Sequence, residues 1–466
     1  MKTAIISIVF ASIIGVIVWS EKGSINAYSS SFEVEKLQNG MDIVTFESNK
    51  VPLVTICLTF KAGGMTETPE LNGLTHLWEH MFFKGNKKIP TQEDFRRRIR
   101  QLGITYNGDT SSEKVRYFFT LPSAFLDEGL EFMADAIRSP NLSQDELEKE
   151  RIVVMNEYQR AASSPGFLSR NAKRKIIYGA QEYQRDPLGK RSTILAATRD
   201  HLNQIKREVF VPQNGALIIG GAVSRDKAVS LAKKYFADWK NPDDWKFPSR
   251  PQLPDFPPNK TFNFSHKLAQ NAKLLMTFKG PRARIDRKDS FAADMLIGLL
   301  DHKSGKFYNK YINSGKVYSA GMSYYTQSHA GEVTLYSSNA AENTDAIKND
   351  LLNEVKLWSQ EGYFTYSQLE DVKRGLLIRH KMETSKPSDY VKNLAFWWAV
   401  TGLDYYSTYI ENLKKVSLKD IQLFVSTYLI DKPKVETVLY SEKDAERLKI
   451  DLNGDAYVKQ HLKEYL

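Results

Sequence analysis

A proline-rich stretch near the middle of the chain limits how the chain can fold. Six prolines lie between Asn241 and Asn259. Proline has no backbone N–H to donate and its ring blocks the preceding helical turn, so this stretch cannot join a helix or a central strand. It leaves about two hundred residues on each side, which is the size of one domain. We therefore predict a linker at residues 241–260 between domains at residues 29–240 and 261–466.

The two halves repeat one order of predicted elements. In the first half, an Asn39-Gly40 turn joins two strands, because this dipeptide is a strong hairpin signal. The elements expected there are strands at 32–37, 41–47 and 52–62, helices at 72–84 and 91–102, strands at 104–109 and 113–121, helices at 123–138 and 143–163, a strand at 216–220 and a helix from 224. The second half has expected strands within 262–279, helices within 286–313, strands at 317–326 and 331–338, and helices at 343–361 and 366–384. We interpret this order as an internal duplication.

The segment His76-Leu-Trp-Glu79-His80 places two imidazoles four residues apart, with a carboxylate between them. On a helix, positions i and i+4 share one face. Two neutral imidazoles there can bind one Zn²⁺ at about 2.0–2.1 Å. Glu79, at the flank of that face, can hold a water without ligating the metal itself. The pattern H-x-x-E-H inverts the zinc-peptidase signature H-E-x-x-H and predicts a metal centre. The alternative interpretation is a helix with polar residues on a solvated face.

A catalytic zinc usually takes three protein ligands and one water. The other six histidines stand alone, without a partner at ligand spacing: His201, His266, His302, His329, His380 and His461. A carboxylate is therefore the expected third ligand. Ser143-Gln-Asp-Glu146 is typical of a capping box that begins a helix. Glu150 and Glu157 would share one face of that helix, nearly two turns apart, although a solvated acidic stripe explains them better when they are taken alone.

The zinc segment resembles a known family. Gly73-Leu-Thr-His76-Leu-Trp-Glu79-His80-Met-Phe-Phe-Lys-Gly85 and the upstream Ala62-Gly-Gly-Met-Thr-Glu67 are similar to the active-site region of the M16 metallopeptidases, which include pitrilysin, insulin-degrading enzyme and the mitochondrial processing peptidase. The family's third zinc ligand is a glutamate whose spacing falls here on Glu157, 77 residues after His80. The family's accessory glutamate, seven residues earlier, falls on Glu150.

The resemblance implies a fold and an activity. The expected fold is α+β, with two tandem related domains that are each a mainly antiparallel sheet with helices packed on it. The expected activity is zinc-dependent endopeptidase hydrolysis of peptides or unfolded polypeptides inside a closed cavity, with one Zn²⁺ per chain. Phe291–Leu300 aligns with the zinc helix and has no H-x-x-E-H pattern, so only the first half can hold metal in this way.

The resemblance also implies a role for each residue of the centre. His76, His80 and Glu157 would bind the metal. Glu79 would take a proton from the attacking water and deliver it to the leaving amine. Glu150 would orient a histidine ligand, and we place it with Glu79 among the candidate catalytic residues.

Two more residues are expected near the substrate. Family members pair the peptide with an edge strand that begins Asn-Ala, and the matching Asn107 is followed here by Gly108. Asn107 is therefore a candidate substrate-binding residue, although Asn-Gly also fits a simple turn. Family members use an arginine and a tyrosine, seven residues apart, on the tetrahedral intermediate. Tyr318 matches the tyrosine and is a candidate catalytic residue, but Tyr311 stands where the arginine is expected.

The missing arginine predicts a partner. In bacterial M16 members of this size, two chains enclose the cavity, and one often carries the zinc while the other carries the Arg/Tyr pair. We expect this chain to be the metal-bearing subunit of such a heterodimer. The alternative is a homodimer in which Tyr318, Lys310 or Lys316 is the donor. Two other classes are a non-catalytic M16-like scaffold or peptide-binding subunit, which typically lacks the zinc residues, and a zinc-stabilised structural domain, which would need a fourth protein ligand.

The N-terminus and the composition predict where the chain works. Lys2 precedes an uncharged apolar stretch from Ala4 to Trp19, so residues 1–28 are predicted to be a signal peptide or an uncleaved anchor for export to a bacterial periplasm. The single Cys57 excludes an intrachain disulfide and is expected to be buried in an apolar strand. The net charge of +10 favours acidic peptides or an anionic membrane surface, and no motif indicates nucleic-acid binding.

Overall fold

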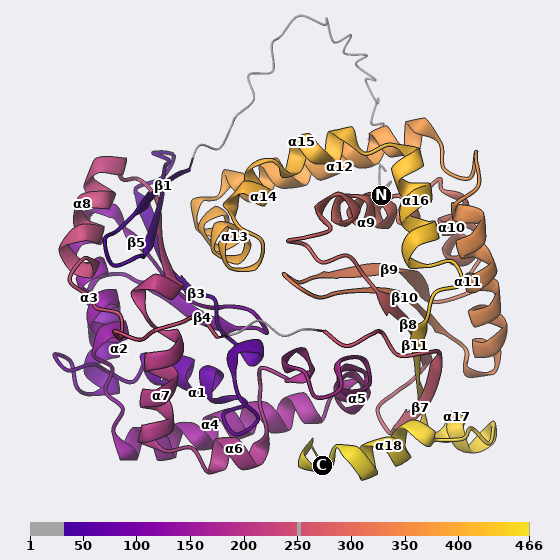
Figure 1. The fold of residues 1–466 in the computed structure, drawn as a ribbon, viewed down its shortest axis with the longest axis horizontal. Coiled ribbons are helices and arrows are strands. Elements are labelled where there is room, and N and C mark those ends of the chain that lie inside the picture. The colour runs from indigo at the N-terminus through magenta and orange to yellow at the C-terminus, as the bar shows by residue number, and fades with distance from the viewer. Residues whose placement is uncertain (1–31, 249–252, 466) are drawn as a thin grey trace, which may run out of the picture. The chain divides into compact units, whose positions relative to one another are not determined.

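The computed structural model describes residues 32–248 and 253–465, and each half of the chain contributes one β-sheet (Figure 1). The predicted signal or anchor segment lies outside the described residues. The first sheet has the strand order β1-β2-β6-β3-β5-β4. Its strands are β1 (Glu33–Lys36), β2 (Asp42–Glu47), β3 (Leu53–Phe60), β4 (Thr105–Thr110), β5 (Val115–Pro122) and β6 (Gly215–Gly221). Within this sheet β2 and β6 run parallel and every other neighbouring pair is antiparallel.

The second sheet repeats this arrangement with the order β7-β11-β8-β10-β9. Its strands are β7 (Lys260–His266), β8 (Ala272–Lys279), β9 (Ser319–Thr326), β10 (Gly331–Asn339) and β11 (Lys434–Ser441). The parallel pair β7–β11 occupies the place of β2–β6, and β9 is an edge strand as β4 is. The predicted duplication into two related α+β domains is confirmed.

Helices of the first half follow the prediction up to residue 162. They are α1 (Leu74–Phe82), α2 (Gln92–Gln101), α3 (Leu126–Arg138), α4 (Gln144–Ala162), α5 (Phe167–Tyr178), α6 (Arg191–Leu195), α7 (Arg199–Val209) and α8 (Arg225–Phe236). Helices α5, α6 and α7 lie between residues 164 and 215, where the sequence predicted no element. Between α8 and β7, the described residues contain no helix or strand.

Helices of the second half continue well beyond the last predicted one. They are α9 (Arg287–Leu300), α10 (Lys306–Tyr308), α11 (Thr344–Trp358), α12 (Tyr366–Ser385), α13 (Pro387–Val400), α14 (Leu403–Ser407), α15 (Tyr409–Lys415), α16 (Leu418–Tyr428), α17 (Glu442–Arg447) and α18 (Asn453–His461). In the part of the chain that the structure describes, none of the helices combines the length and the apolar character needed to cross a bilayer.

Each half gives one helix to the sheet of the other half. Helix α13 packs on β3 and β6 of the first sheet, and α5 packs on β11 of the second. Leu394 of α13 lies in one apolar cluster with Val44, Cys57 and Ile218 of the first sheet. Strands β3 and β6 are therefore covered on both faces, and nearly every residue in them is buried. Cys57 is buried as predicted, and burial raises the pKa of its thiol to about 12.

Candidate metal centre

Helix α1 carries both histidines, and its first turn is capped from a distance. Gly73 precedes the helix with a φ of 97° and has no side chain to cap it. The buried Glu67 carboxylate does this instead, because it accepts hydrogen bonds from the backbone N–H groups of Gly73 at 2.9 Å and Thr75 at 2.8 Å. These groups have no partner within the helix itself. A Cβ at Gly73 would lie 2.5 Å from Gly189 Cα, so close packing and a positive φ both require glycine here.

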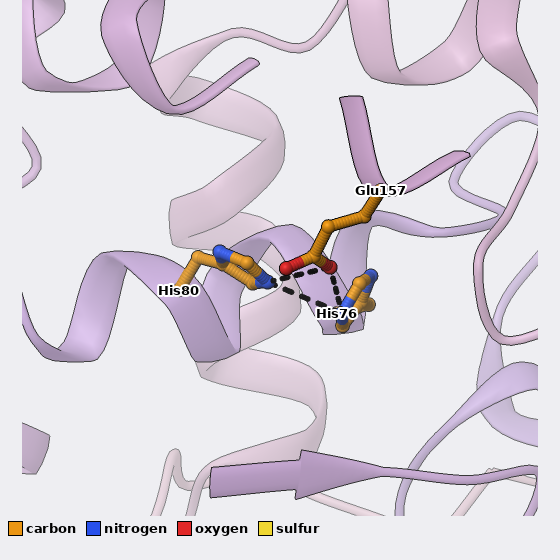
Figure 2. Close-up of side chains that lie close together, drawn as sticks. All are labelled: His76, His80 and Glu157. Atoms are coloured by element: carbon orange, nitrogen blue, oxygen red, sulfur yellow. Dashed lines mark hydrogen bonds and ion pairs between the residues drawn. The ribbon is translucent and has the colours of Figure 1, made fainter. Parts of the chain in front are cut away.

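Helix α4 brings the third predicted ligand to α1. Ser143 caps α4 by accepting a hydrogen bond from the backbone N–H of Glu146, which is one of the two bonds of the predicted capping box. The two helices pack against each other, and Glu157 reaches the two imidazoles (Figure 2). His80 Nε2 lies 3.2 Å from His76 Nε2. Glu157 Oε2 lies 3.7 Å from His76 Nε2 and 3.5 Å from His80 Nε2.

These three atoms fit one tetrahedral zinc ion. Bonds of about 2.0–2.1 Å at a tetrahedral angle separate neighbouring ligand atoms by about 3.3–3.4 Å. The observed separations of 3.2, 3.5 and 3.7 Å are close to that value. Among the described residues, His76, His80 and Glu157 are the one group of His, Cys, Asp or Glu side chains found close enough to hold a metal ion. Two imidazoles, one carboxylate and an open fourth position are the donor set of a catalytic zinc.

The two histidines differ in their surroundings. Burial lowers the pKa of His76 to about 3, so this imidazole is neutral and its lone pair is available. Burial also acts to lower the pKa of His80, but the hydrogen bond with Glu150 and the charges of Glu79 and Glu157 outweigh it and raise the pKa. His80 Nδ1 lies 2.8 Å from Glu150 Oε1. Because a carboxylate only accepts, Nδ1 carries the proton shared with Glu150, and Nε2 is the ring nitrogen that would bind a metal.

Glu150 is held in turn by Lys84, for which the sequence predicted no role. The Lys84 ammonium forms an ion pair with Glu150 Oε2, and the two side chains are only 11% and 3% exposed. Burial acts to raise the pKa of Glu150, but His80 and Lys84 outweigh it and hold the pKa below its usual value. One carboxylate therefore contacts both Lys84, just after α1, and the predicted ligand His80 on α1.

Glu79 lies beside the predicted ligands and not among them. Its side chain is buried against β4, where Thr110 Oγ1 donates a hydrogen bond to Glu79 Oε2 at 2.6 Å. Burial raises the pKa of Glu79 to about 7. A carboxylate with a pKa near neutrality can both accept and return a proton at physiological pH. The sequence had given neither Thr110 nor Lys84 a role in the site.

The described residues of the second half contain no counterpart of this centre. Helix α9 follows β8 as α1 follows β3, and α12 packs on α9 as α4 packs on α1. A Cβ at Gly298 of α9 would lie 2.4 Å from a Val372 methyl group of α12. Buried Met295 and Leu299 lie on the same helix. The contact between α9 and α12 is thus close and apolar at Gly298.

Asn107 lies on the exposed part of the edge strand β4, which is hydrogen-bonded to β5 on one side only. Side chains alternate along a strand, so Asn107 shares a face with Asp109 and not with Gly108 or Thr110. Asp109 forms an ion pair with Arg116, whose guanidinium donates to a backbone carbonyl of α13. Asn107 thus borders the α13 face of the strand, whereas Glu79 contacts the opposite face.

The residues considered for the tetrahedral intermediate differ in solvent exposure and in ion pairing. Tyr318 is 63% exposed, just before β9, whereas Tyr311 is fully buried in the second core. Lys310 Nζ binds Asp350 at 2.8 Å and Glu354 at 2.6 Å, and Lys316 Nζ binds Asp350 at 2.7 Å. Tyr311 cannot replace a surface arginine from this position, and both lysines already have carboxylate partners.

Two family sequence models match the chain. The model described as insulinase (peptidase family M16) matches residues 43–187, and the one described as peptidase M16 inactive domain matches residues 196–376. The chain belongs to the M16 peptidase family. The first match contains all three predicted ligands, and the second covers mainly the half without metal-binding residues.

Two similar proteins align with most of this chain. An uncharacterized zinc protease of Rickettsia felis is 25% identical over 400 residues, which cover 82% of this chain and 92% of that protein. The zinc protease PqqE of Helicobacter pylori is 26% identical over 386 residues, which cover 81% and 83%. The family of this chain is therefore one of zinc proteases.

Solved structures share the fold. A protease from Helicobacter pylori superposes with a TM-score of 0.81 at 22% identity, over 88% of this chain and all of the other. The periplasmic protease PqqL from Escherichia coli superposes with a TM-score of 0.75 at 17% identity, over 93% of this chain and 50% of that protein. The two tandem M16-like domains of the chain are thus a known arrangement.

Proposed function

We propose that this chain is an active zinc endopeptidase that binds one Zn²⁺ through His76, His80 and Glu157. The observation that carries the proposal is the convergence of two imidazole Nε2 atoms and one carboxylate oxygen at separations that fit tetrahedral zinc. When bound there, Zn²⁺ would act as a Lewis acid toward the scissile carbonyl and would lower the pKa of water. A purely structural site would need a fourth protein ligand, and the described residues offer no fourth His, Cys, Asp or Glu in this group.

Glu79 would act as the general base and then as the general acid. Its carboxylate takes a proton from the attacking water at Oε1 or Oε2 and passes that proton to the leaving amine. Its burial raises its pKa to about 7, which suits both steps near neutral pH. Glu150 accepts from His80 Nδ1 and fixes the orientation of that imidazole.

The edge strand β4 would hold the substrate backbone by strand addition. Its outer edge lies beside no other strand among the described residues, and Thr105, Tyr106 and Asn107 are exposed there. An extended peptide can pair with such an edge through backbone hydrogen bonds, which favours unfolded polypeptides over folded proteins. Asn107 is the proposed side-chain contact.

A second chain would complete the active site. A developing oxyanion needs well-placed donors, and the loss of one commonly costs about 10²–10³ in rate. Within this chain Tyr311 is buried, and Lys310 and Lys316 are already paired with carboxylates. Tyr318 is left as the exposed candidate donor. These contacts favour a heterodimer with a related chain that supplies an Arg/Tyr pair over a homodimer.

Export to the periplasm remains part of the proposal and is supported by the apolar stretch Ala4–Trp19 after Lys2. The similar PqqL of Escherichia coli is described as periplasmic. Cell fractionation with and without residues 1–28 tests this location. Retention of the full-length chain in the cytosol would contradict it.

Peptide hydrolysis by the purified chain tests the proposed activity. The chain should bind one zinc and cleave an unfolded polypeptide, either alone at a low rate or faster after mixing with a related chain that lacks H-x-x-E-H. Glu79→Gln should keep the zinc and the fold but lose hydrolysis, since an amide cannot accept the proton. Equal turnover of wild type and Glu79→Gln in both mixtures would favour the non-catalytic M16-like subunit. Full activity of the isolated chain, unchanged by the partner, would exclude the heterodimer.

A further inference from the structure

The turn that joins β4 to β5 is bound by the second half of the chain. Its residue Glu113 is 4% exposed and meets Ser328, which is 2% exposed in the turn between β9 and β10. The Ser328 backbone N–H donates to the two Glu113 carboxylate oxygens at 2.9 Å and 3.1 Å, and the Ser328 hydroxyl donates to the same carboxylate. Tyr183 of the first half adds a hydroxyl donor at 2.6 Å. Hydrogen bonds to a carboxylate are stronger than those between neutral groups, so Glu113 is a strong link between the two turns.

A second contact joins the same hairpin to helix α13 of the second half. Arg116 of β5 forms an ion pair with Asp109 of β4, and its guanidinium also donates to the Lys392 backbone carbonyl at 2.6 Å. Lys392 belongs to α13, which Figure 1 shows in orange beside the first sheet. A guanidinium offers several donors in a fixed plane, so one side chain can hold the strand and the helix together. Strand β4 is therefore tied to the second half through both Glu113 and Arg116.

The two contact points on the second half are themselves connected by Arg284. The Arg284 backbone N–H donates to the Ser328 carbonyl at 3.2 Å. Its guanidinium donates to the carbonyls of Ala399 at 3.2 Å and Val400 at 2.7 Å, near the end of α13. The Ser328 turn and α13 thus hold each other in place, and together they restrict β4 more than two independent contacts would.

These contacts leave the outer edge of β4 open. They attach at the β4–β5 turn and on the α13 face of the hairpin, whereas Thr105, Tyr106 and Asn107 at the other end of β4 are exposed. An extended peptide that pairs with an edge strand follows the register of that strand. A strand that is already ordered binds the peptide without paying for its own ordering, so the contacts from the second half would preorganise β4 for the substrate.

We propose that Glu113 and Arg116 are positioning residues for β4, through which the second half of the chain sets the strand that pairs with the substrate backbone. The inference rests on the proposed function, in which β4 binds the peptide. Neither residue belongs to the predicted ligand set or contacts Glu79 in the interactions described above. Their substitution should therefore weaken peptide binding, while zinc binding and the maximal rate change little.

Glu113→Ala and Arg116→Lys test the two contacts. Alanine removes the acceptor for Ser328. Lysine can keep the ion pair with Asp109 but lacks the planar fork that also reaches α13. A loosened strand must be ordered again on binding, and we expect KM for an unfolded polypeptide to rise about tenfold in each variant, roughly the cost of fixing one residue of backbone. The value of kcat should stay within about threefold of wild type, with one zinc still bound per chain.

Peptide binding without turnover gives a second readout. In the Glu79→Gln background, the fluorescence anisotropy of a labelled unfolded peptide should show the same rise in Kd when Glu113→Ala or Arg116→Lys is added. The matched control is Trp398→Phe, which removes another hydrogen bond between the halves, from Trp398 Nε1 on α13 to Asp42 Oδ2 on β2 at 2.9 Å. Three strands separate β2 from β4, so the KM and Kd of this control should equal those of its parent.

Ser328→Ala is the milder variant for the same contact. It removes the hydroxyl donor and keeps the backbone N–H, and we expect KM to rise about threefold, the loss of one hydrogen bond. This variant decides the role of Glu113 even if Glu113→Ala does not fold. An unchanged KM in a folded Ser328→Ala variant, with Arg116→Lys also unchanged, would contradict the inference.

The outcomes separate the inference from the proposed function. If the wild-type chain hydrolyses no peptide with or without the related chain, and Glu79→Gln binds none, the proposed function fails and the inference fails with it. If wild type is active but Glu113→Ala and Arg116→Lys keep its KM and the Kd of their parent, the contacts stabilise the fold without positioning β4. An equal rise in KM for Trp398→Phe would show a general effect of loosened halves and would also overturn the inference.

Discussion

Substitutions at Lys84 and Glu150 should affect the stability of the first domain and its affinity for zinc differently. Lys84→Met tests the stability. The Lys84–Glu150 ion pair is almost fully buried, with side chains 11% and 3% exposed. Removal of one partner from a buried pair leaves an uncompensated charge and costs about 3–5 kcal/mol. The matched control is Lys88→Met. Lys88 pairs with Glu131 at 2.9 Å but is 60% exposed, and such a surface pair contributes about 0–1 kcal/mol.

The double variant Lys84→Met with Glu150→Leu isolates the effect on the metal. Replacing both charges by apolar side chains of similar size is often neutral for stability, so most of the loss should be recovered. His80 Nδ1 then has no carboxylate to hold it. Loss of such a partner typically weakens metal binding about 10–100-fold, or about 1.4–2.7 kcal/mol.

Urea unfolding of the metal-free protein and competition with a zinc chelator measure the two effects. The expected order of stability is wild type and Lys88→Met first, the double variant close behind, and Lys84→Met last. Wild-type zinc affinity in the double variant would refute the proposed role of Glu150. A Lys84→Met variant as stable as Lys88→Met would refute the buried ion pair.

Three further predictions concern other parts of the structure. Glu67→Ala removes the acceptor for the backbone N–H groups of Gly73 and Thr75. Urea unfolding should show that the free energy of unfolding falls by about 1–3 kcal/mol for each N–H group left buried and unpaired. An unchanged urea midpoint would contradict the capping of α1 by Glu67. Burial raises the pKa of Asp294 to about 6, so the folded state keeps this proton to a higher pH than the unfolded state, and the free energy of unfolding falls as pH rises from about 4 to 6. Asp294→Asn should therefore gain stability relative to wild type by about 2–3 kcal/mol more at pH 7.5 than at pH 4, and a pH-independent difference would refute the shift. Leu394→Ala in α13 should cost about 2–5 kcal/mol and should destabilise the first sheet, as hydrogen exchange of β3 and β6 would show, although Leu394 belongs to the second half.

Local patterns in the sequence predicted the elements that depend on neighbouring residues. The spacing of His76 and His80 placed both on one helix face, and Asn39-Gly40 predicted the hairpin that the structure contains. The repeated order of elements predicted two related domains. The helix and the hairpin depend on contacts within a few residues, which periodicity and turn propensity indicate directly. The repeated order is a series of such local elements.

The choice of Glu157 as third ligand came from a different kind of information. Periodicity placed Glu150 and Glu157 on one helix face but could not say which helix they meet. The family resemblance supplied the long spacing, and the structure shows the two helices in contact. The similarity to a family thus predicted the long-range contact between Glu157 and the two histidines, which residue patterns alone did not predict.

Tertiary structure alone decided which polar side chains meet around the centre. The sequence indicated no role for Lys84, Glu67 or Thr110, yet their side chains meet Glu150, the start of α1 and Glu79, respectively. Packing in three dimensions also set the surroundings of β3, whose apolar run does not reveal that α13, more than three hundred residues later, covers one face. By itself the sequence determined the helix that carries His76 and His80 and the repeated order of strands and helices, because helix periodicity and turn signals are local. The hydrogen bonds that orient the base and the histidine depend on helix and strand packing, and no local propensity encodes the distance between two such elements.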